Sequence, residues 1–269
     1  MKTRAITGFF FVIVMLGSVL SGHYPFGIFY LLLTLLCLNE FYGLIKQSGL
    51  KPNVQTGLLN GAFIYILFAF INYQDSLIWH KLLFLLTLTI SAIFIQELFK
   101  RSMAPFTNIT YTLAGLIFVC LPFTFFHALA YMKDGFNFHY PLAFLLLLWA
   151  NDTGAYLVGV KFGRSKLFER HSPKKTWEGF MGGILISAGA ALIIGYYFKE
   201  LLWNQWVSTA ILISCFGTLG DLIESMFKRS INVKDSGGIL PGHGGLLDRF
   251  DGLFLAAPVV YTYLYFIIN

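Results

Sequence analysis

Hydrophobic residues fill almost the whole chain in runs of about 17 to 25 residues, separated by short polar breaks. A run of this length forms a helix that crosses a bilayer about 30 Å thick, and backbone groups in lipid must pair within their own segment. The pattern therefore predicts an all-α polytopic membrane protein. We expect about nine transmembrane helices, at residues 5–22, 25–45, 56–73, 78–98, 107–131, 139–160, 177–198, 205–227 and 251–268.

Basic residues predict how these helices are oriented. Of the 19 lysines and arginines, all but Lys81, Lys133 and Lys199 fall on one side of the predicted membrane. Positively charged loops stay in the cytoplasm, so the N-terminus is expected inside and, after nine spans, the C-terminus outside. The basic flank and apolar run at the N-terminus also resemble a secretory signal, but the predicted topology favours an uncleaved first span.

Composition supports the membrane class and divides the chain. The mean hydropathy of +0.70 excludes a soluble domain. Residues 1–138, with about five spans, are nearly pure hydrocarbon, whereas residues 139–269 hold most polar groups and two cytoplasmic loops, 161–176 and 228–250. The net charge of +6 belongs to the cytoplasmic face, where it attracts anionic lipid headgroups and nucleotides, and nothing about it indicates nucleic acid binding.

Five acidic residues of the second half interrupt or open apolar runs, namely Asp152, Asp221, Glu224, Asp248 and Asp251. A carboxylate at membrane depth costs at least about 2.5 kcal/mol and usually faces a partner, a cation or a water-filled cavity. Spacings of three residues place two pairs of these acids on single helix faces. The set predicts a divalent-cation site, with a salt-bridge network as the alternative. Other acids, such as Glu40 and Glu97, are interpreted as ordinary charges near cytoplasmic helix ends.

Two loops carry residues suited to phosphate binding. Glycines 237, 238, 242, 244 and 245 let backbone N–H groups approach phosphate oxygens, although such loops are more often simple turns. The other loop holds six basic residues between Lys161 and Lys175, followed by Thr176 at an expected helix start. Its segment SPKKT favours a phosphate grip, and a loop that is basic for reasons of topology alone is the alternative.

The segment SMFKRSINVKDSGGILPGHGGLLDRFD, beginning at Ser225, resembles the signature of the phosphatidate cytidylyltransferases, or CDP-diacylglycerol synthases. Its pattern is S-x-x-K-R-x4-K-D-x7-H-G-G-x-x-D-R-x-D, and every fixed position is filled. The upstream segments NDTGAYLVG, GRSKLF and SPKKTWEG also look like motifs of that family. The resemblance is strong in the second half of the chain and rests on hydropathy and span count in the first.

The resemblance implies transfer of CMP from CTP to phosphatidate, giving CDP-diacylglycerol and pyrophosphate in a multi-pass protein of the cell membrane with its site facing the cytoplasm. It implies Mg²⁺ as cofactor, with a second cation left open, and Asp221 and Asp248 as leading ligands beside Asp251 and Glu224. CTP and the membrane lipid phosphatidate are the expected partners, and a homodimer is left open. We expect in-line attack by the lipid phosphate on the α-phosphorus of CTP.

The remaining expected site residues fall into two groups. The catalytic group, besides Asp221 and Asp248, is Lys228, Arg229 and His243, where the histidine either protonates pyrophosphate or is a hydrogen-bonding strut. Asp152 is either a third ligand or an orienting group. The expected substrate-binding residues are Asp152, Lys174, Lys175, Thr176, Ser225, Lys234, Asp235, Gly244, Gly245 and Arg249.

Two other functions stay open at this point. One is a CTP-dependent transferase acting on another lipid phosphate or on a polyprenol. The other is an intramembrane cation transporter, because carboxylates within the membrane also line ion paths. The absence of an obvious internal repeat in the sequence argues against the transporter.

Overall fold

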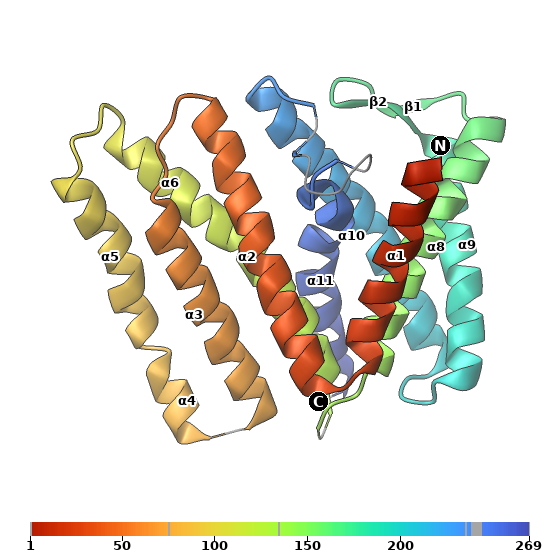
Figure 1. Ribbon diagram of the computed structural model, residues 1–269. Coiled ribbons are helices and arrows are strands. Elements are labelled where there is room, and N and C mark those ends of the chain that lie inside the picture. Colours follow the sequence, from red (N-terminus) through yellow and green to blue (C-terminus); the bar gives the residue numbers. More distant parts are fainter. Residues whose placement is uncertain (1, 75, 134, 235, 238–243, 269) are drawn as a thin grey trace.

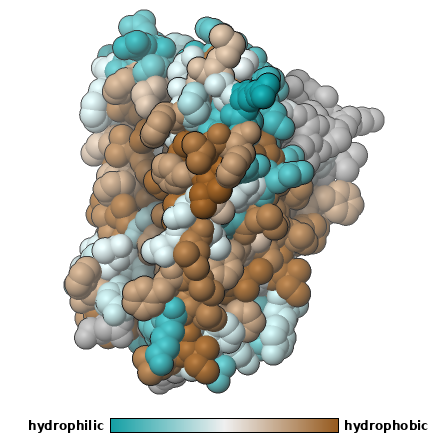
Figure 2. All heavy atoms as spheres, turned by 90° about the vertical axis from the view of Figure 1, so that its left-hand side faces the viewer, coloured by the Kyte–Doolittle hydropathy of each residue, from teal (hydrophilic) through white to brown (hydrophobic). Residues whose placement is uncertain are grey.

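A computed structural model shows a bundle of long helices that lie side by side, with the two termini at opposite ends (Figure 1). The structure describes residues 2–74, 76–133, 135–234, 236–237 and 244–268. Figure 2 shows that the middle of one side is largely hydrophobic, whereas hydrophilic residues gather at its upper end. This distribution suits a protein surrounded by lipid.

The described elements of the first half of the chain are all helices or helical turns. Its elements are α1 (Lys2–Leu20), α2 (His23–Gln47), α3 (Val54–Tyr73), α4 (Leu77–Leu82), α5 (Leu85–Phe99), α6 (Pro105–Gly115), a π-helical turn (Leu116–Cys120), α7 (Leu121–Ala128) and a 3-10 turn (Leu129–Tyr131). The predicted span 78–98 is divided between α4 and α5, and the predicted span 107–131 runs from α6 through α7.

Among the described residues of the second half there are four long helices and one small hairpin. Its elements are α8 (His139–Phe162), β1 (Lys166–Phe168), β2 (Ser172–Thr176), α9 (Trp177–Tyr197), α10 (Trp203–Ser230) and α11 (Leu247–Ile268). The strands β1 and β2 pair antiparallel, with Lys166 opposite Thr176. The expected loop 161–176 is therefore largely an ordered β-ribbon at one end of the bundle (Figure 1).

The prediction of a helical membrane protein is confirmed, because each of the nine predicted spans coincides with a helical segment. Within the described residues, eight segments are long and apolar enough to cross a membrane, and α1 contributes the shorter apolar run Thr7–Leu20. The expected loop 228–250 is shorter at both ends, since α10 reaches Ser230 and α11 begins at Leu247. Lysine and arginine at a helix end can extend into the interface, which allows a helix to continue past the hydrocarbon.

The two halves of the chain share one hydrophobic core. The ring of Phe123 in α7 lies 5.1 Å from that of Phe250 in α11, and Phe41 in α2 stacks on Phe227 in α10 at 4.8 Å. The boundary expected at residue 138 is thus not a break in packing. The first half can hold parts of the second in place.

Candidate functional site

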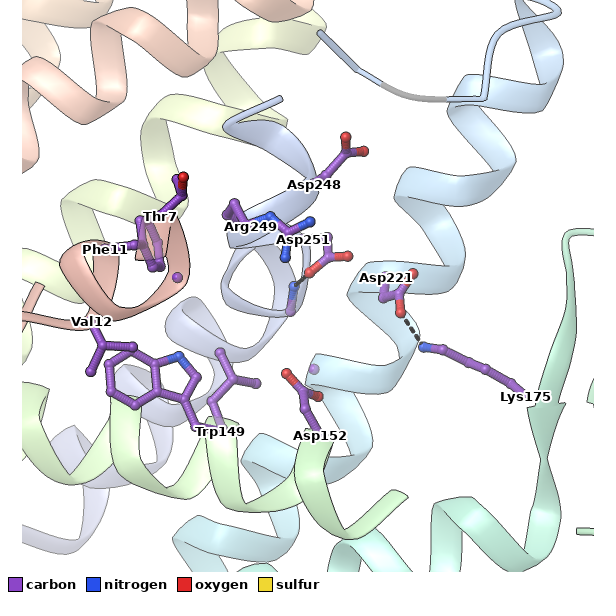
Figure 3. Close-up of a pocket in the computed structure, with 14 residues that line it drawn as sticks. Thr7, Phe11, Val12, Trp149, Asp152, Lys175, Asp221, Asp248, Arg249 and Asp251 are labelled. Atoms are coloured by element: carbon purple, nitrogen blue, oxygen red, sulfur yellow. Dashed lines mark hydrogen bonds and ion pairs between the residues drawn. The ribbon is translucent and has the colours of Figure 1, made fainter. Parts of the chain in front are cut away.

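A cavity of about 320 Å³ lies where α1, α8, α10 and α11 meet the strand β2. Its charged lining comprises Asp152, Asp221, Asp248 and Asp251 together with Lys175 and Arg249. The remaining wall is apolar or small, with Phe11, Val12, Leu148 and Trp149 among its residues. Figure 3 shows Phe11 and Val12 on the side of the cavity opposite Asp221 and Lys175. The cavity therefore has a charged side and an apolar side.

Glycines bring α10 and α11 into contact where the acids stand. A Cβ added at Gly220 would lie 2.4 Å from the carbonyl oxygen of Asp251, and one at Gly252 would lie 3.6 Å from the carbonyl oxygen of Gly217. Without side chains at these points the helix backbones approach closely, as in many membrane helix pairs. Because Asp221 follows Gly220 and Asp251 precedes Gly252, this approach carries both carboxylates to one cavity.

Asp221 has partners from two directions. Its carboxylate forms an ion pair with Lys175 Nζ at 2.5 Å, which links the β-hairpin to α10 (Figure 3). Ser225, one helical turn further along α10, donates a hydrogen bond to Asp221 at 3.3 Å. The predicted residues Asp221, Lys175 and Ser225 are thus brought together, while Asp152 of α8 lines the same cavity.

Lys228 and Asp248 form the centre of a second group of contacts. Lys228 Nζ lies 2.6 Å from both Glu224 and Asp248. The second oxygen of Asp248 accepts hydrogen bonds from the backbone amides of Ser236 and Gly245, each at 3.1 Å. Glu224, with a side chain only 1% exposed, lies behind the cavity lining. The alternative of a structural salt-bridge network therefore fits Lys228 and Glu224. Asp248 also pairs with Lys228, but it lines the cavity and accepts hydrogen bonds from both described ends of the loop before α11.

The signature loop, which joins Ser230 at the end of α10 to Leu247 at the start of α11, contains glycines that are needed for packing where the structure describes them. Gly244 has a φ of +84°, a left-handed conformation that L side chains rarely adopt. Its neighbour Gly245 leaves no room for a Cβ, which would lie 2.0 Å from both Glu40 Oε1 and Ser236 Oγ. Their predicted contact with phosphate stays a prediction. Lys234 is exposed, and the predicted site residues Asp235 and His243 lie outside the described residues.

The other basic loop divides its predicted residues. Lys175 reaches the cavity, whereas Lys174 is exposed and is not part of the cavity lining. Thr176 is buried and caps α9, since its hydroxyl accepts a hydrogen bond from the Gly179 amide at 3.2 Å. Glu178 accepts hydrogen bonds from the backbone amide of Ser165, which fixes the hairpin to the start of α9. This loop is an ordered support for Lys175.

Arg229 lines a different cavity from the one that contains Asp221. Its guanidinium donates to the Val233 carbonyl at 3.2 Å, and it lines a second cavity of about 320 Å³ with Arg170 and His171. The structure therefore does not place Arg229 in the lining of the acidic cavity beside Asp221. Its catalytic role stays a prediction.

Sequence reasoning missed Glu40 of α2. This residue is 8% exposed, and its carboxylate accepts a hydrogen bond from the Leu247 amide at 2.9 Å, across 207 positions of sequence. One signal was available, because no basic residue stands three or four positions from Glu40. An acid in an apolar helix without a local partner indicates a distant one.

The donor set of the cavity suits one class of metal ion. Within the described ranges, no three histidine, cysteine or acidic side chains stand close enough to enclose an ion by themselves. Mg²⁺ does not require such an enclosure, because it keeps several waters and binds through one or two carboxylates plus substrate phosphates. Carboxylates that share an open cavity fit this mode, and Asp221 and Asp251 are two of the four that line it.

Comparison with known proteins extends the resemblance over the whole chain. Residues 2–267 match the model of the cytidylyltransferase family. A phosphatidate cytidylyltransferase of Staphylococcus aureus (strain COL) is 34% identical over 264 residues, which is 97% of each chain. Proteins of the same name from Staphylococcus haemolyticus and Staphylococcus epidermidis are also 34% identical, over 262 and 264 residues. The first half of the chain, where the motifs are absent, is thus included in the similarity.

Proposed function

The chain belongs to the cytidylyltransferase family, and on that premise we propose that it transfers CMP from CTP to phosphatidate, producing CDP-diacylglycerol and pyrophosphate. The reaction would supply phospholipid synthesis from within the cell membrane, with the cavity open to the cytoplasm. One observation carries the proposal beyond the family match. A single cavity combines a row of carboxylates and a lysine with an apolar wall, which suits one charged and one amphiphilic substrate.

The chemistry asks little of a protein base. The phosphate of phosphatidate is already an anionic nucleophile, so a bond forms between its oxygen and the α-phosphorus of CTP. The bond from that phosphorus to the bridging oxygen breaks in line, and pyrophosphate departs. Positioning and charge neutralisation therefore supply the rate.

Residues of the cavity can provide both effects. Asp221 and Asp251 would hold Mg²⁺, with Asp152 and Asp248 as further oxygen donors at the same cavity. When bound, Mg²⁺ neutralises charge on the CTP phosphates and orients them. Lys175, whose Nζ lies 2.5 Å from Asp221, would neutralise charge on a phosphate oxygen in the same cavity. Lys228 keeps Asp248 and the loop in place.

The apolar wall accounts for the lipid substrate. Phe11 and Val12 of α1 and Trp149 of α8 line the side of the cavity away from Lys175 (Figure 3). Apolar side chains there would contact the glycerol and first acyl carbons, while the phosphate reaches the carboxylate side.

Labelled CTP tests the proposal directly. The purified protein in detergent is supplied with Mg²⁺, CTP labelled in the α-phosphate, and either phosphatidate or a polyprenyl phosphate. We expect label in the lipid and an equal amount of pyrophosphate with phosphatidate only. If label enters the polyprenyl phosphate instead, the proposed acceptor substrate, phosphatidate, would be wrong. If neither lipid is labelled, while the reconstituted protein carries a cation flux, the transporter alternative would replace the enzyme.

A further inference from the structure

Glu40 connects the first half of the chain to the signature loop of the second. It lies in α2, is 8% exposed, and accepts a hydrogen bond from the amide of Leu247 at 2.9 Å through Oε2. Leu247 is the first residue of α11. An acidic side chain is favourable at this position, because the N-terminus of a helix carries unpaired N–H groups and partial positive charge.

The other carboxylate oxygen of Glu40 lies against the described ends of the loop. A Cβ added at Gly237 or at Gly245 would lie 2.0 Å from Glu40 Oε1. Ser236, which precedes Gly237, is only 3% exposed, and the Cβ at Gly245 would also lie 2.0 Å from its Oγ. The two loop ends therefore close around one carboxylate, and glycine is the residue that permits the approach.

The same loop ends hold Asp248. The amides of Ser236 and Gly245 both donate to Asp248 Oδ2 at 3.1 Å, and the Asp248 amide donates to Ser236 Oγ at 3.4 Å. Asp248 lines the cavity and pairs with Lys228. A displacement of the loop ends would thus change the position of Asp248 and of the start of α11, which also carries Asp251.

We propose that Glu40 is a positioning residue through which the first half of the chain holds the signature loop and the start of α11 against the acidic cavity. The inference rests on the proposed function for its kinetic consequence. Glu40 contacts no reacting atom in this account, and it acts through Ser236, Gly245 and Leu247. The nearly pure hydrocarbon half of the chain thereby takes part in setting the catalytic geometry.

Three substitutions at Glu40 separate its contributions. Glu40→Gln keeps the length and one acceptor oxygen for the Leu247 amide, whereas Glu40→Asp is one methylene shorter and Glu40→Ala removes the acceptor. We expect kcat/KM for CTP to fall about tenfold or more in the Ala and Asp variants, as loss of a charge-assisted hydrogen bond predicts. The Gln variant should stay within about threefold of the unmodified protein. The KM for phosphatidate should stay unchanged in all three.

Glu97 provides a matched control. It is 2% exposed and lies in the same half, but it accepts from Asn108 at 2.7 Å and pairs with Lys100, away from the loop. Glu97→Ala is expected to lower the thermal midpoint without changing kcat/KM for CTP. Loss of kcat/KM for CTP in the Glu97 variant equal to that in Glu40→Ala would reduce Glu40 to a general stabilising residue and overturn the proposal.

Hydrogen exchange tests the inference without activity. In Glu40→Ala, peptides that contain Gly245 and Leu247 should exchange about tenfold faster, with little change elsewhere. Without the hydrogen bond from the Leu247 amide to Glu40, this end of the loop would open locally more often. If the unmodified protein transfers no CMP, the proposed function fails, and the exchange rates still decide the positioning role. Unchanged exchange at Gly245 and Leu247 in a folded Glu40→Ala protein would refute that role.

Discussion

Lys174 and Lys175 are neighbours in the sequence, but the extended backbone of β2 directs their side chains to opposite faces. Lys175 pairs with Asp221 at 2.5 Å and lines the acidic cavity, whereas Lys174 is exposed. Sequence reasoning assigned both to phosphate binding, because charge pattern alone does not distinguish alternate positions of an unrecognised strand. The hairpin separates them.

This separation gives a paired prediction. Lys175→Gln should lower kcat/KM for CTP by about 10- to 100-fold, the range expected when a charged group loses its hydrogen bonds. Lys174→Gln, of identical chemistry one residue away, should change it by less than about threefold. Steady-state kinetics at saturating phosphatidate measure both. Equal losses would mean that the phosphates lie over the exposed face of the hairpin and not in the cavity.

At the scale of elements, α8 and α9 pack through glycines. A Cβ at Gly182 would lie 2.5 Å from Val158 Cβ, and one at Gly183 would lie 2.5 Å from Asn151 Oδ1. Close backbone approach is the main source of helix association in lipid, where the hydrophobic effect between helices is absent. This contact holds α8, which carries Asp152, against α9, which begins directly after the hairpin.

Two alanine substitutions in α9 test this contact. Gly182→Ala would press a methyl group on the branched side chain of Val158 and should destabilise the protein by about 1–3 kcal/mol. Gly189→Ala meets nothing within 4 Å and should be neutral or slightly stabilising. Thermal midpoints in the same detergent compare the two. A midpoint for Gly182→Ala at or above that of Gly189→Ala would contradict the close packing.

The hydrophobic pattern predicted the helices well, because span length is set by the bilayer. It did not predict the hairpin, whose strands of three and five residues lack an apolar alternation. It also did not predict which segments share the cavity. The contribution of α1 depends on packing across more than 130 residues of sequence, and Thr7, Phe11 and Val12 carry no motif. Likewise, nothing near Glu40 in the sequence points to Leu247.

The whole molecule has its ends on opposite faces, as an odd number of crossings requires (Figure 1). The basic hairpin lies at the end from which α1 starts, and the link from α9 to α10 lies at the other end (Figure 1). Positive charge on the hairpin favours a cytoplasmic location for that end. The substrates agree with this orientation, since CTP is a cytoplasmic nucleotide and the cavity opens beside the hairpin residue Lys175.

Cysteine labelling can establish the orientation. In a protein whose native cysteines 37, 120 and 215 are replaced by alanine, Lys174→Cys should react with a membrane-impermeant maleimide only after cells are permeabilised. Lys199→Cys, exposed at the opposite end of α9, should react in intact cells. The reverse pattern would place the cavity on the outer face, where CTP is scarce, and would argue against the proposed function.

The most direct measurement is transfer of label from CTP to phosphatidate, with and without Mg²⁺, in the unmodified protein and in Asp221→Asn, Asp251→Asn and Glu169→Gln. Glu169 is an exposed acid outside the cavity and serves as the control. We expect Mg²⁺-dependent transfer that persists in Glu169→Gln and falls at least about 100-fold in both aspartate variants. Undiminished transfer in the folded aspartate variants would contradict the assignment of this cavity as the catalytic site.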